Sequence, residues 1–268
     1  MILHKGPDSE FFVDAIIATS KSYGIIVNSF YELESVFLNY WNQNFNPRAW
    51  CVGPLCLAKT PSQPDQEKPT WLQWLDQKQS EGRSVQYVAF GTQAEIPAEQ
   101  FREIAIGLEK SNFEFLWAVR TKPGMELEDG LEKRVKEMGM VVREWVDQRV
   151  ILEHDSVRGF LSHCGWNSVT ESKVPILAWP MMAEQHLNAR MVVEEIKIGL
   201  RVETADGTVR GFVKWEGLKK MVKVLMEGER GKNLRKNVKE LGDMARKAIE
   251  EGGSSGKTLD LLIDDVNT

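Results

Sequence analysis

Residues 145–185 read WVDQRVILEHDSVRGFLSHCGWNSVTESKVPILAWPMMAEQ and decide the fold of this chain. Within them, the apolar run 159–161 leads into Ser162-His163-Cys164-Gly165, and a helix-compatible segment starts at Trp166. This order predicts a strand, a tight turn and the start of a helix. Because a helix N-terminus carries unpaired backbone N–H groups and a partial positive charge, such a turn is suited to an anion, and phosphate is the expected one.

The same alternation continues on both sides of this stretch. Apolar runs predict strands at 85–90, 115–120, 140–146, 159–164 and 176–180, and amphipathic patterns predict helices at 97–112, 131–138 and 184–197. Strands and helices that alternate at this length form a mostly parallel sheet with helices on both faces. We therefore expect an α/β, Rossmann-like fold whose ligand lies beyond the carboxyl ends of the strands.

The sequence before this core predicts part of a second domain. A helix is expected at 11–19, and 24–57 is βαβ-like but lacks most of a sheet. Residues 59–70 are rich in proline and charge, which favours an extended interdomain linker. We therefore divide the chain into 1–58, the linker 59–70, and 71–268 with a helical C-terminal tail.

Composition narrows the functional classes. The 268 residues are 42% hydrophobic, which is enough for a core, and a net charge of −5 argues against a nucleic-acid partner. Three cysteines without a CxxC pair encode neither a disulfide framework nor a structural zinc site. No long apolar run or N-terminal signal pattern indicates membrane insertion or export, so we expect a cytoplasmic location.

Three motifs can be dismissed. Residues 252–258 (GGSSGKT) lack the first glycine of a P-loop, because Glu251 stands at that spacing and a helical pattern precedes it. No G-x-G-x-x-G exists, which disfavours NAD or FAD. His163 and Cys164 would point to opposite faces as neighbours at a strand end, which argues against a Cys-His nucleophile.

Residues 145–185 closely resemble the signature box of the plant secondary-product glycosyltransferases, the UDP-dependent family 1 enzymes with two facing Rossmann-like domains. The shared positions are W..Q, then H, then HCGWNS..ES, then P..AWP...EQ. The resemblance continues at 28–34 (NSFYELE), 50–54 (WCVGP) and 85–91 (VQYVAFG), and so spans nearly the whole chain. It implies the GT-B architecture, of which this chain would hold the C-terminal half and lack most of the N-terminal domain.

The resemblance implies how the UDP part of a donor would be bound. Trp145 would stack under uracil and Gln148 would bond uracil or ribose; a core tryptophan and a turn amide are the alternatives. His163 would donate an N–H to a diphosphate oxygen, whereas a lone histidine is more often structural. The residues implied to complete this anion cradle are Gly165, Asn167, Ser168 and Thr92.

The remaining box residues concern the ribose and the sugar. Ser168-x-x-Glu171 satisfies the capping-box pattern, in which the glutamate bonds back to the cap N–H, but the resemblance assigns Glu171 to the ribose hydroxyls. It also implies that Trp166 shapes the sugar pocket and that Glu184 and Gln185 bond the sugar's hydroxyls. A terminal glutamine in this box leans toward glucose.

The amino end departs from the family pattern. Members carry an acceptor-binding domain with a catalytic histidine as general base and an aspartate that orients it. We expect no catalytic residue in this chain, because no apolar strand precedes His4 and the base is expected in the missing N-terminal region. His154 is expected to support its loop rather than touch a ligand.

A second departure lies inside the box. The family places four residues, usually ending in glycine, between Glu-Ser and Val-Pro, whereas here Ser172 is followed by Lys173 alone before Val174. Three residues are missing, which is about 4.5 Å of helix at about 1.5 Å per residue. Either the helix is shortened or the next strand is displaced, and displacement would misplace Glu184 and Gln185.

The leading hypothesis is therefore the donor-binding half of a metal-independent, inverting UDP-glycosyltransferase. It would transfer a sugar, with glucose implied, from a UDP-sugar to a hydroxyl of a small plant metabolite such as a flavonoid or phenolic. Without the general base, this chain alone is expected to be inactive or weakly active. The alternative is a non-catalytic UDP- or UDP-sugar-binding remnant or regulatory module.

Overall fold

The computed structural model describes residues 7–58, 67–119, 134–136, 138–208 and 211–267. The chain forms two compact units. Unit 1 contains Met1–Pro61 together with Leu241–Thr268, and unit 2 contains Ser62–Glu240. No helix within the described residues is long and apolar enough to cross a bilayer.

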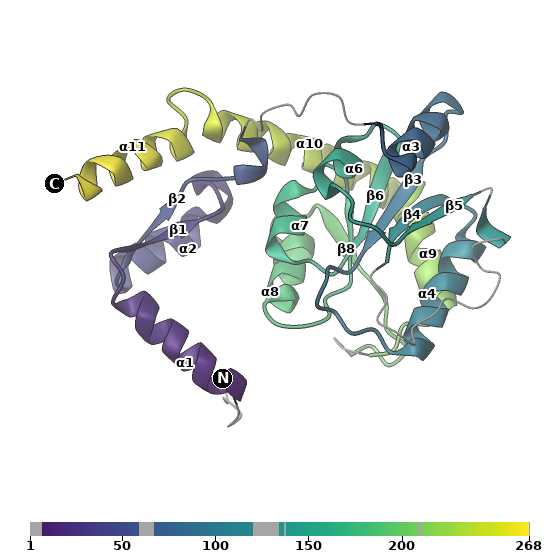
Figure 1. Ribbon diagram of the computed structural model, residues 1–268, viewed down its shortest axis with the longest axis horizontal. Coiled ribbons are helices and arrows are strands. Elements are labelled where there is room, and N and C mark those ends of the chain that lie inside the picture. The colour runs from purple at the N-terminus through teal and green to yellow at the C-terminus, as the bar shows by residue number, and fades with distance from the viewer. Residues whose placement is uncertain (1–6, 59–66, 120–133, 137, 209–210, 268) are drawn as a thin grey trace. The chain divides into compact units, whose positions relative to one another are not determined.

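Unit 2 is built on a six-stranded sheet in which every neighbouring pair is parallel. The strand order is β5-β4-β3-β6-β7-β8 (Figure 1). This is the doubly wound order, in which β4 and β5 are added on one side of β3, and β6, β7 and β8 on the other. The strands are β3 (Val85–Ala89), β4 (Glu114–Ala118), β5 (Gly139–Val142), β6 (Val157–Ser162), β7 (Ile176–Ala178) and β8 (Gly199–Arg201). The prediction of an α/β, Rossmann-like parallel sheet is confirmed.

Helices cover both faces of this sheet, with α4 and α9 on one side and α7 and α8 on the other (Figure 1). The helices that begin in unit 2 are α3 (Thr70–Ser80), α4 (Ala98–Ser111), α6 (Gln148–Glu153), α7 (Trp166–Glu171), α8 (Gln185–Arg190), α9 (Trp215–Met226) and α10 (Glu229–Ile249). A π-helical turn, Met191–Glu195, follows α8.

The core of unit 2 shows why α4 forms where the sequence predicts it. The stripe residues Phe101, Ile104 and Leu108 are buried, and Asn112 ends the helix in the left-handed region with φ 60°. Gly107 lets α9 approach closely, because a Cβ there would lie 2.9 Å from Leu218 Cδ2. Parallel sheets need apolar cover on both faces, and all five residues of β3 are buried accordingly.

Unit 1 contains a parallel pair of strands, β1 (Gly24–Val27) and β2 (Arg48–Cys51). Its helices are α1 (Pro7–Ser20), α2 (Tyr31–Asn44), the 3-10 turn Leu55–Leu57 and the C-terminal α11 (Ser254–Val266). Phe30 packs in a small apolar cluster with Ala245 and Ala248, and the buried Ser255 hydroxyl donates to the Gly53 carbonyl at 2.5 Å.

The tail contributes to unit 1. The sequence-based division into 1–58, 59–70 and 71–268 stays a prediction, and within the structure Leu241–Thr268 groups with unit 1, where Ala245, Ala248 and Ser255 pack. The expected linker 59–70 lies mostly outside the described residues, and Thr70 already starts α3. Of the expected helix 131–138, residues 131–133 and 137 also lie outside them.

Candidate functional site

A cavity of about 590 Å³ opens beyond the carboxyl ends of β3, β4 and β6. It lies where the strand order reverses, which is the usual ligand position in this type of sheet. The predicted donor-binding residues that line it are Thr92, Trp145, Gln148, His163, Gly165, Asn167, Ser168, Glu171, Glu184 and Gln185. The structure therefore gathers all of them except Trp166 around one space.

Trp166 is the first residue of α7 and is not part of the lining. Its predicted role in shaping the sugar pocket stays a prediction. The sequence interpretation left out other lining residues, among them Gly91, Gln93, Ala118 and Glu144. Each of them ends a strand or follows its carboxyl end. Their position after a predicted strand was therefore the signal in the sequence that could have identified them.

Trp145 presents its indole to the cavity. It lies between β5 and α6, and 71% of its surface is exposed. An indole this exposed packs in no core, so the alternative of a core tryptophan is wrong. A flat apolar ring at the edge of a cavity suits a flat ring as partner.

Gln148 and Glu171 are joined directly across the cavity wall. The Gln148 amide, at the start of α6, donates to Glu171 Oε2 at 2.7 Å and to Ser168 Oγ at 3.2 Å. The N-cap of α7 is Gly165, so Ser168 lies inside the first turn of the helix and is not its cap. Glu171 is the last residue of the helix. The capping-box alternative for Ser168 and Glu171 is therefore wrong, and Gln148 instead fixes the carboxylate of Glu171 beside the cavity.

His163 is enclosed by two glycines. A Cβ on Gly91 would lie 2.8 Å from its Nε2, and a Cβ on Gly165 would lie 2.7 Å from the same atom. These glycines follow β3 and β6, which pair as Ala89 with Ser162. Only the absence of side chains at both positions leaves room for the imidazole.

Burial lowers the pKa of His163, and the Ala89 backbone and the Glu184 carboxylate oppose this effect only in part. The imidazole is therefore neutral at pH 7. Its Nδ1 is buried and makes no hydrogen bond to the described residues. A neutral ring of this kind offers one donor and one acceptor nitrogen to its surroundings.

Cys164 is not a nucleophile. It has a positive φ of 62° in the turn, is fully buried, and its thiol lies 3.7 Å from the Ser162 carbonyl. Burial raises the pKa of this thiol to about 12, so it stays protonated at neutral pH. The turn is also held from α8, because the Asn188 amide donates to the Cys164 carbonyl at 3.0 Å.

A short helix and a fully paired strand flank the three-residue gap. α7 ends at Glu171, while β7 keeps its parallel pairing with β6 and with β8. Glu184 and Gln185 consequently line the same cavity as the residues before the gap. Gln185 Oε1 accepts from the backbone N–H groups of Met181 and Met182, both at 3.0 Å, so its amide nitrogen is the part left for a ligand.

The charge of the lining is unusual for an anion site. Three carboxylates line the cavity, those of Glu144, Glu171 and Glu184, while the described lining contains no lysine or arginine. An anion here would therefore rely on neutral donors and on the N-terminal end of α7, where Gly165, Asn167 and Ser168 face the cavity. No group of three or more metal-ligating side chains occurs among the described residues.

Known proteins match this chain over most of its length. The family model of UDP-glucoronosyl and UDP-glucosyl transferase matches residues 34–244. UDP-glycosyltransferase 90A1 of Arabidopsis thaliana is 56% identical over 266 residues, which are 97% of this chain and 55% of that protein. The chain therefore spans about half the length of the curated relatives it matches.

Two solved structures share the fold. Medicago truncatula UGT71G1 complexed with UDP-glucose has a TM-score of 0.82 at 32% identity and covers 99% of this chain and 59% of its own. Phytolacca americana UGT2 complexed with UDP-2fluoro-glucose and pterostilbene has a TM-score of 0.83 at 34% identity, with 97% and 58% covered. Such neighbours are GT-B proteins, so the predicted fold class is confirmed.

Proposed function

Because this chain belongs to the UDP-glucoronosyl and UDP-glucosyl transferase family, we propose that its cavity binds a UDP-sugar and that the chain is the donor-binding half of a glycosyltransferase. The acceptor would be a hydroxyl of a small plant metabolite. A cavity of about 590 Å³ has the size of an ordinary small-ligand site, which spans roughly 300–1,000 Å³.

The nucleoside would be held by three side chains. Uracil stacks on the exposed indole of Trp145, which has no competing partner ring among the described residues. The ribose hydroxyls donate to the Glu171 carboxylate, which Gln148 already holds in place through its 2.7 Å hydrogen bond. This fixed carboxylate needs little reordering when the ligand arrives, and preorganisation of this kind favours binding.

The diphosphate would be held without a formal positive charge. His163 donates one N–H to a phosphate oxygen, and Gly165, Asn167, Ser168 and Thr92 surround the same region of the cavity. Because His163 is neutral, each contact is a hydrogen bond rather than an ion pair. Bound diphosphate would raise the pKa of His163 and so favour its protonated form.

The sugar would meet two side chains of opposite character. Gln185 has its oxygen occupied by Met181 and Met182, so it donates to a sugar oxygen, while the exposed carboxylate of Glu184 accepts from sugar hydroxyls. One donor beside one acceptor suits adjacent hydroxyls of a hexose. We propose glucose as the hexose on this ground and on the family resemblance.

The transfer step needs a base that this chain does not supply. In an inverting reaction the acceptor hydroxyl attacks the anomeric carbon from the face opposite UDP, loses its proton to a general base, and releases UDP. We propose that the base belongs to the part of the relatives that lies outside this chain. Its absence would lower the rate by about 10²–10⁴-fold.

The observation that carries this proposal is the meeting of Trp145, the Gln148–Glu171 pair and the enclosed His163 around one cavity. Isothermal titration calorimetry with UDP and UDP-glucose tests it, with ADP as the control nucleotide. We expect both uridine nucleotides to bind and ADP to bind more weakly. If neither uridine nucleotide bound at millimolar concentration, the proposal would be refuted.

A non-catalytic UDP-binding module is the second candidate, because the residues that line the cavity account for binding of the donor alone. The two candidates differ in turnover and share the binding site. Release of free UDP from UDP-glucose should be measured with a panel of flavonoid and phenolic acceptors. Release of UDP by this chain alone would exclude the non-catalytic module and would contradict the proposal that the base lies outside this chain.

A further inference from the structure

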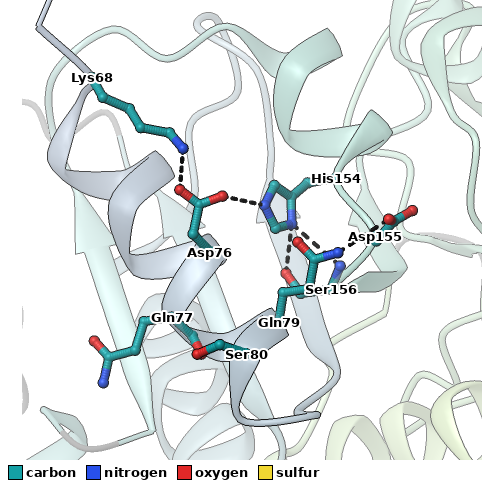
Figure 2. A network of polar contacts seen from close by, with 8 residues as sticks. All are labelled: Lys68, Asp76, Gln77, Gln79, Ser80, His154, Asp155 and Ser156. Carbon is teal, nitrogen blue, oxygen red and sulfur yellow. Dashed lines mark hydrogen bonds and ion pairs between the residues drawn. The ribbon is translucent and has the colours of Figure 1, made fainter.

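A polar network joins α3 to the end of α6 that lies farthest from Gln148 (Figure 2). His154 lies at its centre, with only 10% of its side chain exposed. Its Nε2 is 3.2 Å from Asp76 Oδ1, and its Nδ1 is 3.2 Å from the backbone nitrogen of Ser156. Asp76 also forms an ion pair with Lys68.

The tautomer of His154 follows from its neighbours. The Ser156 backbone N–H can only donate, so Nδ1 is the acceptor and the proton lies on Nε2, which donates to Asp76. The hydrogen bonds from Lys68 and His154 lower the pKa of Asp76, so it remains an acceptor at neutral pH. The ring therefore cannot rotate without losing a hydrogen bond on each side.

The network lies where three site-bearing elements begin or end. His154 is the C-cap of α6, and its N–H donates to the Ile151 carbonyl at 3.1 Å. Ser156 directly precedes β6, and its carbonyl accepts from Val85 N–H, the first residue of β3, at 2.7 Å. One imidazole thus connects α3 to α6, β3 and β6.

Each of these elements delivers a cavity residue at its other end. α6 carries Gln148 at its start, β6 leads to His163, and β3 leads to Gly91. The six residues of α6 span about 9 Å and those of β6 about 20 Å. Because α6 and β6 are short and stiff, a displacement of either one at the network also displaces its other end, which lies at the cavity.

We propose that His154 is a positioning residue for the donor site, setting α6 against β3 and β6 through Asp76 and Ser156. It acts through Gln148, whose hydrogen bond to Glu171 depends on that placement. His154 does not line the cavity and touches no ligand. The choice of UDP as the probe rests on the proposed function, whereas the placement of α6 can be measured without any ligand.

The test compares four variants of the full chain with one control variant. His154→Ala should raise the Kd for UDP about tenfold, because sub-ångström displacement of positioning groups has effects of this order. His154→Gln keeps an N–H near Nε2 and should recover most of the loss. Asp76→Ala should match His154→Ala, and the double variant should be no worse than either single variant.

Gln79→Ala is the matched control. Gln79 also lies on α3 and donates to Asp155 at 3.1 Å, so its loss breaks a contact between the same helix and the same loop without touching His154 (Figure 2). We expect Gln79→Ala to keep the wild-type Kd. Hydrogen exchange of residues 145–153, measured without ligand, should rise several-fold in His154→Ala and stay unchanged in Gln79→Ala.

Two outcomes would overturn the inference. One is a wild-type Kd for UDP in His154→Ala, and the other is equal exchange of residues 145–153 in His154→Ala and Gln79→Ala. If the wild-type protein bound no UDP, the proposed function would fail, and the exchange comparison would still decide the positioning role. If His154→Ala did not fold, Asp76→Ala and His154→Gln would supply the same two measurements.

Discussion

Replacing Gly165 by alanine should disable the phosphate end of the site and leave the nucleoside end intact. The new Cβ would lie 2.7 Å from His163 Nε2, whereas ordinary contact begins at 3.4 Å. The imidazole must therefore move by 3.4 − 2.7 = 0.7 Å. It cannot simply retreat toward β3, because Gly91 already lies close to the same nitrogen.

The backbone at Gly165 adds little to this cost. Its φ of −57° and ψ of 144° are allowed for alanine, so the substitution tests contact rather than strain. Loss of a glycine N-cap costs up to about 1 kcal/mol of stability, which a folded domain tolerates. A shift of most of an ångström at a positioning group weakens its interaction by up to about 10²-fold.

Calorimetry with two ligands separates the effects. For Gly165→Ala we expect the Kd for UDP to rise between about tenfold and 10²-fold and the Kd for uridine to stay within about twofold, because Trp145 and Glu171 are untouched. Gly217→Ala is the control, since its nearest neighbour would be 3.5 Å away. Unchanged UDP binding in Gly165→Ala, or an equal loss for UDP and uridine, would refute the reasoning.

Three further predictions follow from the same cavity. Trp145→Ala should weaken UDP binding by about 1–3 kcal/mol. Gln185→Ala should weaken it less, because Gln185 is proposed to contact only the sugar, and calorimetry that gave the reverse order would contradict this assignment. Burial lowers the pKa of His163 below 6.5, so the unfolded chain binds more protons than the folded chain as the pH falls below 6.5. The melting temperature should therefore fall as the pH is lowered below 6.5, and it should fall less in His163→Gln. Because carboxylates and no lysine or arginine line the described cavity, added salt should not raise the Kd for UDP; a steep rise in calorimetry would indicate a cation that the lining does not contain.

The sequence was most informative about long, regular elements. The alternation of strands and helices identified β3, β4, β6 and β7, whose buried runs are long enough to read by pattern. β8, Gly199–Arg201, was missed because the charged Arg201 interrupts its apolar run, whereas β7, which is no longer, lies in a buried run that continues over 174–180. The packing of Leu241–Thr268 with unit 1 could not be predicted, because an amphipathic pattern indicates that a helix has an apolar face but not which core receives it.

The site was readable as a set of residue types, but its contacts were not. Gly91 and Gly165 are visible as glycines in the sequence, yet their shared contact with His163 depends on β3 and β6 being neighbours. The Gln148–Glu171 hydrogen bond likewise depends on how α6 and α7 pack. Interactions between distant segments are fixed by tertiary packing, and a local pattern cannot specify them.

The three-residue gap illustrates which parts of this site are fixed independently of chain length. The start of α7 is set by the turn after β6, so every residue up to Glu171 keeps its place. The position of β7 is set separately by its pairing with β6 and β8. Between these two fixed points only 172–175 can adjust, and there the Ser172 hydroxyl donates to the Val174 carbonyl at 2.7 Å to close the shortened connection.

The deletion therefore falls at 172–175, in residues that lie between α7 and β7 and do not line the described cavity. A loss of three residues on the amino side of Glu171 would have rotated Ser168 or Asn167 out of the lining, because helical positions advance by about 100° per residue. A loss after Ile176 would have shifted β7 by an odd number of residues and exchanged its two faces. The same change is tolerable at 172–175 because the sheet, not the connection, carries Glu184 and Gln185 to the cavity.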